Sequence, residues 1–158
     1  MKTWQEIYSK NIELDHIFQV KYSNESKMYE KNCIGLLVEL GEFINETKCF
    51  KYWTIKKPEK EKVLEEYSDC IMSIMTFHNE EELDFSIPYD KTNNLLELLN
   101  KIYSDTTKIY ENNDINIVKK IFANIMHIKD YLDISEEDLI EAISKKQLIV
   151  EERLNSNY

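Results

Sequence analysis

The sequence predicts an all-α fold, a bundle of about five or six helices that forms one domain over residues 1–158. Only 2 glycines and 2 prolines occur in the chain, so few residues interrupt a helix. Apolar side chains recur at spacings of three and four residues along most of the chain, which places them on one face of a helix. A hydrophobic content of 42% is sufficient for the core of a single domain of this length.

An apolar stripe predicts each of the first three helices. The first helix is expected over residues 4–22, and the polar residues 23–26 end it. Its stripe contains Trp4, Ile7, Tyr8, Ile17 and Phe18. The second helix has an apolar arc of Leu36, Leu37, Leu40, Phe43 and Ile44. The third is expected to begin near Pro58, and its arc contains Val63, Leu64, Tyr67, Cys70, Ile71 and Ile74.

Three further helices follow a loop at residues 84–90, which Pro88 marks. The first of them carries Leu95, Leu96, Leu98, Leu99, Ile102 and Tyr103. Asp114 is expected to cap the next, which carries Ile117, Val118, Ile121, Phe122, Ile125 and Met126. Residues 135–138 read Ser-Glu-Glu-Asp, which is typical of a capping-box start for the last helix.

Acidic residues gather along one edge of the apolar arcs of the second and third helices. Glu39 and Glu42 are three residues apart, and so are Glu66 and Asp69. Side chains at this spacing lie on the same face of a helix, so each pair offers two oxygen ligands. If the two helices pack through their apolar arcs, the four carboxylates face one another at the rim of the core.

Four carboxylates at close range repel one another unless a cation holds them. Hard oxygen ligands without a nearby His or Cys favour Mg²⁺, with Mn²⁺ as a substitute, over zinc. A solvated acidic face is the alternative, because 30 Asp and Glu residues produce such pairs by chance. The matched offset on two successive helices favours the metal site.

The segment that joins these two helices, residues 45–58, is rich in lysine and aromatic residues. The candidates for phosphate contacts are Lys48, Lys51, Lys56 and Lys57, and those for stacking on a base are Phe50, Tyr52 and Trp53. Alternatively, the lysines keep a loop solvated and the aromatic side chains close the end of the helical core.

Composition excludes several classes of protein. The only glycines, Gly35 and Gly41, lie inside a helical pattern, so a Walker-type or Rossmann-type phosphate loop is excluded. The net charge of −10 argues against a nucleic-acid or membrane-surface partner. The N-terminus has no signal-peptide pattern and no apolar run has membrane-spanning length, so we expect a cytoplasmic protein, or one of the host cytoplasm if a phage encodes it.

The run E-L-G-E-F-I-N-E-T-K-C-F-K-Y-W, followed by K-K-P and E-E-Y-S-D, resembles the dimeric all-α dUTPase family in its short bacterial and phage form. That family belongs to the all-α nucleoside triphosphate pyrophosphohydrolases, with the MazG-like enzymes and dCTPases. The resemblance implies a homodimer that hydrolyses dUTP to dUMP and pyrophosphate at carboxylate-bound Mg²⁺. It implies that Glu39, Glu42, Glu66 and Asp69 are the metal ligands and that Lys51 and Trp53 line the substrate pocket.

The predicted catalytic residues are Glu39 and Glu46. The resemblance places Glu46 near the attacking water, and a carboxylate at the edge of the cluster is suited to accept the proton of that water. The family's N-terminal glutamine corresponds to Gln19, which we expect to bind substrate.

The end of the chain carries a second part of the resemblance. The family closes with a K-N-x-x-N-x-x-R-x-x-x-G-Y pattern that folds over the phosphates, and Lys146, Arg153 and Tyr158 lie at the matching positions. Residues 146–158 are therefore expected to form a C-terminal tail that contacts phosphate. Guanidinium, ammonium and phenol groups are suitable donors for a triphosphate.

Several positions depart from the family pattern, among them Asn157, which replaces the glycine near the end of the tail. Met72 begins the Met-Ser pair that replaces His-Phe, and Gln147 and Val150 replace the two asparagines of the tail. These departures motivate an alternative, a related pyrophosphohydrolase with another base preference such as dCTP. A further alternative is a non-catalytic interaction protein with a vestigial metal site.

Overall fold

The computed structural model describes residues 1–78 and 82–156, and this part of the chain is helical and contains no strand. The helices are α1 (Trp4–Lys21), α2 (Met28–Thr47), α3 (Lys60–Met75), α4 (Leu95–Asn112), α5 (Ile115–Tyr131) and α6 (Glu136–Asn155), and the short 3-10 helix η1 (Thr76–His78) follows α3. The predicted all-α helical bundle is confirmed. Among the described helices, none combines the length and the apolar character needed to cross a membrane.

Side-chain caps explain where several helices begin. The hydroxyl of Thr3 accepts the backbone N–H of Glu6, and the carboxylate of Glu6 accepts that of Thr3, which forms a capping box at α1. Asp114 and Ser135 cap α5 and α6, as predicted. Helix α3 begins at Lys60, two residues after the proline that was expected to mark its start.

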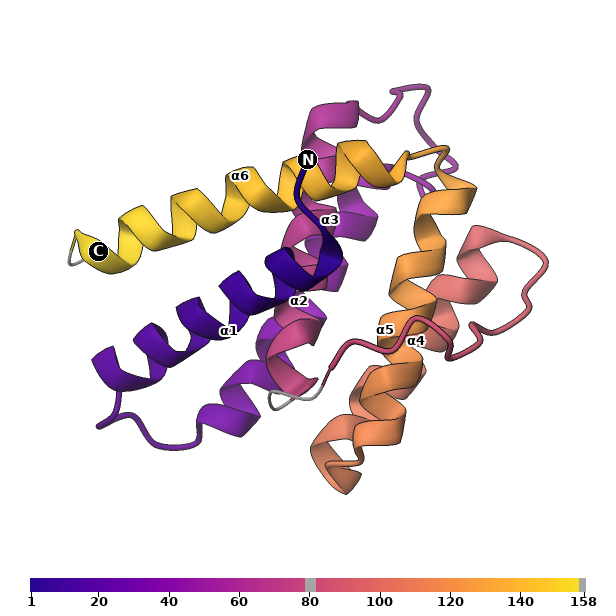
Figure 1. The fold of residues 1–158 in the computed structure, drawn as a ribbon. Coiled ribbons are helices and arrows are strands. Elements are labelled where there is room, and N and C mark those ends of the chain that lie inside the picture. The colour runs from indigo at the N-terminus through magenta and orange to yellow at the C-terminus, as the bar shows by residue number, and fades with distance from the viewer. Residues whose placement is uncertain (79–81, 157–158) are drawn as a thin grey trace.

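Helix α3 lies at the centre of the bundle, where it packs against α1, α2, α5 and α6 (Figure 1). The apolar arcs of α2 and α3 meet in the core as predicted, and the members that are at most 5% exposed are Leu36, Leu40, Phe43, Val63, Tyr67, Cys70, Ile71 and Ile74. The rings of Phe43 and Tyr67 stack with their centroids 5.0 Å apart. This contact fixes the acidic edge of α2 beside that of α3.

The hydroxyl of Tyr67 connects α3 to α5. It donates to the carbonyl oxygen of Ile125 at 2.6 Å and accepts the backbone N–H of Lys129 at 3.0 Å. Residues four apart are the pair that an α-helix joins directly, so the hydroxyl takes part in the backbone hydrogen bonding of α5.

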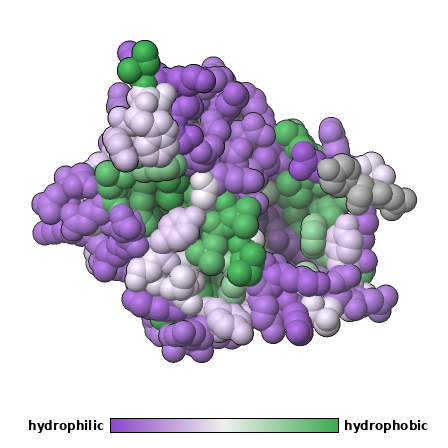
Figure 2. Space-filling model, turned by 180° about the vertical axis from the view of Figure 1, so that it is seen from behind, coloured by the Kyte–Doolittle hydropathy of each residue, from purple (hydrophilic) through white to green (hydrophobic). Residues whose placement is uncertain are grey.

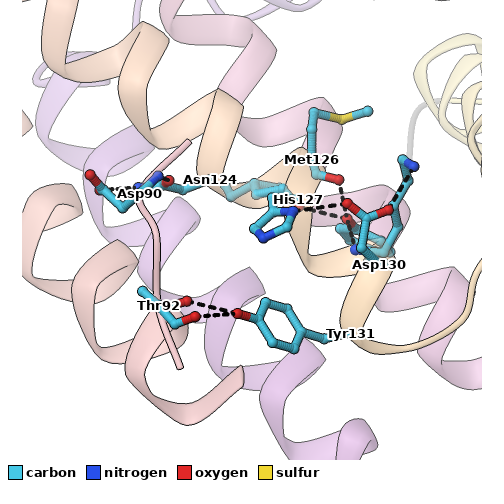
Figure 3. A network of polar contacts seen from close by, with 10 residues as sticks. Asp90, Thr92, Asn124, Met126, His127, Asp130 and Tyr131 are labelled. Carbon is cyan, nitrogen blue, oxygen red and sulfur yellow. Dashed lines mark hydrogen bonds and ion pairs between the residues drawn. The ribbon is translucent and has the colours of Figure 1, made fainter. Parts of the chain in front are cut away.

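A polar network holds the segment before α4 against α5 (Figure 3). The side-chain oxygen of Asn124 accepts the backbone N–H of Asp90 at 2.7 Å, and its amide donates to the Asp90 carboxylate at 2.8 Å. Further along, the hydroxyl of Tyr131 donates to the carbonyl oxygen of Thr92 at 3.0 Å. Asn124 is fully buried, so its two bonds to Asp90 satisfy an amide that has no access to water.

One part of the predicted α1 stripe is wrong. Ile7, Tyr8 and Leu14 are buried, but Phe18 is 42% exposed. Its side chain lies on the wall of a surface hollow instead of in the core. The periodicity marked the correct face of the helix, but the core does not extend to its last turn.

Candidate functional site

Three of the predicted carboxylates form a cluster. Glu39 and Glu42 on α2 and Glu66 on α3 each offer one oxygen, and these oxygens all lie within 4.8 Å of one another. Oxygens at opposite positions around Mg²⁺ are about 4 Å apart. The donor set therefore fits a hard divalent cation after a small closure of the three side chains.

The fourth predicted ligand, Asp69, lies one helical turn beyond Glu66 and is paired with Lys146. The Nζ of Lys146, on α6, lies 2.6 Å from Oδ2 of Asp69 and 3.4 Å from Oε1 of Glu65. The structure thus brings three of the four carboxylates together and joins the fourth to a lysine.

Burial and mutual repulsion shift the acid–base equilibria of these groups. The pKa of Glu39 is raised to about 7, first by burial and then by the charges of Asp69, Glu42 and Glu66. Burial followed by the charge of Asp69 also raises the pKa of Glu66. For Asp69, burial raises the pKa although the hydrogen bond from Lys146 opposes the shift. Ionisation of Glu39, Glu66 and Asp69 therefore costs free energy, and a bound cation would reduce that cost.

Helix α4 helps to position the acidic edge of α2. The hydroxyl of Tyr103 donates to the carbonyl oxygen of Leu37 at 2.9 Å. A Cβ atom at position 41 would lie 3.1 Å from the oxygen of Tyr103, which is tighter than an ordinary contact. The glycine between Glu39 and Glu42 therefore permits this close approach of the two helices.

A hollow of about 290 Å³ adjoins the cluster on the side of α1, and we call it the α1 hollow. Glu39 and Asp69 form part of its wall. Its other lining residues are Asn11, Leu14, Asp15, Phe18, Gln19, Met28, Asn32, Met72, Ser73, Thr76 and Val150. It combines apolar side chains with amide and carboxyl groups, which is the usual composition of a small-molecule site.

Two polar residues in this wall were missed from the sequence. The amide of Asn11, which is 2% exposed, donates to Oδ2 of Asp15 at 3.2 Å. The hydroxyl of Thr76 donates to Oδ1 of Asp15 at 3.2 Å, and burial raises the pKa of that carboxyl to about 6. Asn11 and Asp15 are one turn apart on the core-facing side of α1, and this interruption of the apolar stripe is the signal that could have identified them.

A second hollow, of about 410 Å³, adjoins the cluster at Glu42 and Glu66, and we call it the α2 hollow. Its lining residues are Val38, Gly41, Glu42, Asn45, Glu46 and Glu66. The predicted catalytic carboxylate of Glu46 therefore opens onto the same space as two cluster members. Its Oε2 lies 3.8 Å from the Nζ of Lys48.

Three predicted substrate-binding residues lie apart from these hollows. Lys51, Trp53 and Lys56 belong to the connection between α2 and α3, which extends beyond the ends of these helices (Figure 1). Trp53 is 65% exposed and packs against the rings of Phe50 and Tyr52. In the described residues of a single chain, Lys51, Trp53 and Lys56 belong to the lining of neither the α1 hollow nor the α2 hollow.

The predicted residues of the C-terminal segment are divided between different environments. Lys146 and Arg153 both belong to α6, which continues to Asn155, and Tyr158 lies outside the described residues. Among the positions that depart from the family, Met72 and Val150 line the α1 hollow. Gln147 does not, because it is fully buried and donates its amide to the carbonyl oxygen of Ile7 at 2.8 Å. Its role in the structure is to join α6 to α1.

A larger hollow of about 490 Å³ lies between α3 and α6, and we call it the α6 groove. Its charged residues largely neutralise one another, since Lys60 pairs with Asp138 and Lys145 pairs with Glu141, each at 2.6 Å. Lys146 also lines this groove. The side chains suited to a metal and a substrate therefore lie at the two smaller hollows beside the carboxylates. Lys146 lines the α6 groove and also contacts Asp69, so it connects the groove to the carboxylates.

Fold and site together define a helical-bundle protein with an acidic centre suited to a hard cation and an adjoining hollow for a small molecule. A sequence model described as dUTPase matches residues 3–158, nearly the whole chain. The chain belongs to the dUTPase family and is an enzyme of the dUTP diphosphatase class. A comparison with individually curated proteins gave no match.

Proposed function

We propose that this dUTPase is Mg²⁺-dependent and that Glu39, Glu42, Glu66 and Asp69 hold the metal. The observation that carries the proposal is the cluster of three carboxylate oxygens within 4.8 Å, with Asp69 one turn away on the same helix. When bound, Mg²⁺ would neutralise phosphate charge and lower the pKa of a coordinated water. Mn²⁺ would serve as a substitute, since it accepts the same oxygen ligands.

Glu46 is proposed as the base that accepts a proton from the attacking water. Its carboxylate lines the α2 hollow together with Glu42 and Glu66. A water bound at the cluster and facing this hollow would therefore lie near Glu46. Glu39 is proposed as a second catalytic residue, because its carboxylate belongs to the cluster and lines the α1 hollow.

The α1 hollow is proposed to receive the nucleoside. Asn11, Gln19 and Asn32 supply amide groups to its wall, and Asp15 supplies a carboxyl group. Uracil and deoxyribose present both hydrogen-bond donors and acceptors, which such groups can match. Phe18 and Met72 add apolar surface for the base.

Phosphate contacts are proposed for Lys146, Arg153 and Tyr158, because their spacing matches the family pattern. Lys51, Trp53 and Lys56 lie on an exposed connection that a second subunit could bring to a site. A homodimer is therefore part of the proposal.

A second candidate differs only in the base. Met72 and Val150 depart from the family pattern and both line the α1 hollow, which is the observation that favours it. In this candidate the same metal chemistry acts on dCTP or another nucleotide.

The test is pyrophosphate release by the purified protein from dUTP, dCTP, dTTP, dATP, dGTP and UTP, with Mg²⁺ and with EDTA. We expect release from dUTP that requires Mg²⁺ and that falls by a factor of roughly 100 or more in Glu66→Gln. Glu61→Gln is the matched control, since this exposed glutamate lies on the same helix outside the cluster.

Each outcome discriminates between the candidates. Preference for another nucleotide would assign Met72 and Val150 to altered base recognition. Equal activity in EDTA, or full activity in Glu66→Gln, would refute the proposed metal site. Family membership already disfavours the non-catalytic alternative.

A further inference from the structure

Lys146 forms an ion pair with Asp69, one of the four proposed metal ligands. Its side chain is 13% exposed, that of Asp69 is 18% exposed, and their charged atoms are 2.6 Å apart. This ion pair joins α6 to α3, and both of its side chains are largely shielded from solvent. It is therefore stronger than an exposed surface ion pair.

We infer that Lys146 is the internal counter-ion of the metal-free site, that it competes with the metal for Asp69, and that binding of the metal releases its ammonium group toward the triphosphate. The inference rests on the proposed metal site and adds a function to a residue that had been assigned only to phosphate.

Competition follows from the geometry of the ion pair. The ammonium group of Lys146 already occupies Oδ2 of Asp69 at 2.6 Å, so a cation that took this oxygen as a ligand would have to displace it. A divalent cation at the cluster would also repel the ammonium group, because both carry positive charge within a few ångströms. Consistent with this, the oxygens that already converge belong to Glu39, Glu42 and Glu66, while Asp69 faces the lysine.

The displaced ammonium group has both space and a second partner on the side of the α6 groove. Lys146 has a flexible four-carbon stem, and it lies in the wall of the α6 groove. Its second partner, Glu65, is 57% exposed and lies 3.4 Å away on the groove side. A short rotation of the stem would exchange Asp69 for Glu65 or for a phosphate oxygen without movement of either helix.

The inference assigns opposite effects to one side chain. In the absence of nucleotide, Lys146 weakens metal binding because it occupies a ligand and adds positive charge. In the presence of metal, it strengthens nucleotide binding because its ammonium group is available to the phosphates. The expected order is metal first and nucleotide second.

The test measures Mn²⁺ affinity without nucleotide, by electron paramagnetic resonance, and affinity for a non-hydrolysable dUTP analogue in the presence of Mg²⁺. In Lys146→Met we expect Mn²⁺ to bind roughly fivefold tighter or more, the lower range of coupling between two sites. The analogue should bind more weakly. Lys145→Met is the matched control, since Lys145 is the adjacent lysine, is 70% exposed and pairs with Glu141.

Thermal unfolding gives a readout that is independent of turnover. In EDTA, Lys146→Met should unfold at a lower temperature than the wild type because Asp69 loses its counter-ion. Saturating Mn²⁺ should reduce this difference. Lys146→Gln, which keeps a donor toward Asp69 but no charge, provides a second variant if Lys146→Met does not fold.

The results separate this inference from the proposed function. Equal or weaker Mn²⁺ binding in both neutral variants, with clear binding by the wild type, would overturn the counter-ion role and leave the metal site intact. A gain in Lys145→Met as large as that in Lys146→Met would also overturn it, because net charge alone would then explain the effect. Absence of Mn²⁺ binding in all variants and in the wild type would overturn both.

Discussion

The carboxylate of Glu39 lies where three other acidic side chains and the edge of the core meet. Its pKa of about 7 means that near neutral pH the metal-free protein holds this group partly protonated. Asp15, on the wall of the adjoining hollow, has a pKa of about 6 because of burial. These two residues make the metal-free protein sensitive to pH in a range where most carboxylates are fully ionised.

This sensitivity has a definite sign. The folded pKa values of Glu39 and Asp15 lie above their ordinary values of 4.5 and 3.8. Their contribution to stability is therefore fully present at low pH and is lost as pH rises through about 6 to 7. We expect the free energy of unfolding, measured with urea in EDTA, to fall between about pH 5 and pH 7.5.

Glu39→Gln should reduce this fall and should also weaken the stabilisation by Mg²⁺, because a metal that binds only the folded state raises its stability. Glu61→Gln, on the exposed surface, should leave both effects unchanged. A stability that is constant across this range in EDTA would contradict the crowding of charge at the cluster.

The placement of each acidic pair on one face of its helix could be predicted from the sequence, since residues three apart share a face. The pairing of Lys146 with Asp69 could not be predicted, because the two residues are 77 positions apart in the chain (146 − 69). Only the packing of α6 against α3 brings them together. Asn11 and Asp15 were missed for a related reason. Polar residues in an amphipathic helix are usually solvated, and only the structure shows that these two line a hollow.

At the scale of elements, α3 carries two of the proposed ligands and depends on α5 for its position. The hydroxyl of Tyr67, next to Glu66 in the chain, bonds the backbone of α5 at Ile125 and Lys129. Helix spans were predicted well because their apolar periodicity is strong. This link was not predicted, because periodicity marks Tyr67 as a core residue without indicating a partner for its hydroxyl.

Tyr67→Phe should destabilise the protein by about 1–3 kcal/mol, because the ring is retained while buried backbone groups of α5 lose their partner. Chemical denaturation followed by circular dichroism measures the change. Tyr110→Phe is the control, since Tyr110 is 61% exposed and should change stability by less than about 0.5 kcal/mol. Equal effects of the two substitutions would show that the Tyr67 hydroxyl contributes nothing.

The segment before α4 is a second element-scale feature (Figure 3). Asn124→Leu keeps the branched shape and the number of heavy atoms of the side chain but removes both hydrogen bonds to Asp90, so it should destabilise the protein by about 1–3 kcal/mol. Limited proteolysis should then cut residues 82–94 faster than in the wild type. Asn100→Leu is the control, because the Asn100 amide donates to the carbonyl oxygen of Leu96 within its own helix. Unchanged protection would show that this network does not hold the segment.

At the scale of the whole molecule, apolar side chains remain on the surface of the single chain. Figure 2 shows hydrophobic residues gathered among hydrophilic ones on the face opposite to that in Figure 1. On α2, Ile34 is 62% exposed and Val38 is 50% exposed, and the two are one turn apart. An exposed apolar stripe of this kind is typical of a surface that another protein covers.

We expect the protein to sediment as a homodimer at micromolar concentration, and Ile34→Lys to shift it toward the monomer, because a lysine in an apolar interface must lose its hydration. Sedimentation equilibrium measures both. Val20→Lys, at an apolar position of α1 that is 78% exposed, is the control and should not change the mass. A wild-type protein that is monomeric at all concentrations would contradict the dimer.

The repulsion among Glu39, Glu42, Glu66 and Asp69 has a consequence for protein engineering. A search for heat-resistant variants, conducted without metal and scored only by survival of the fold, would select neutral residues first at Glu39, Glu42 and Glu66, because Asp69 is already paired with Lys146. Such variants would have a higher unfolding temperature but would lose activity. Any campaign to improve the robustness of this enzyme should therefore hold the four acidic positions constant, or screen in the presence of Mg²⁺.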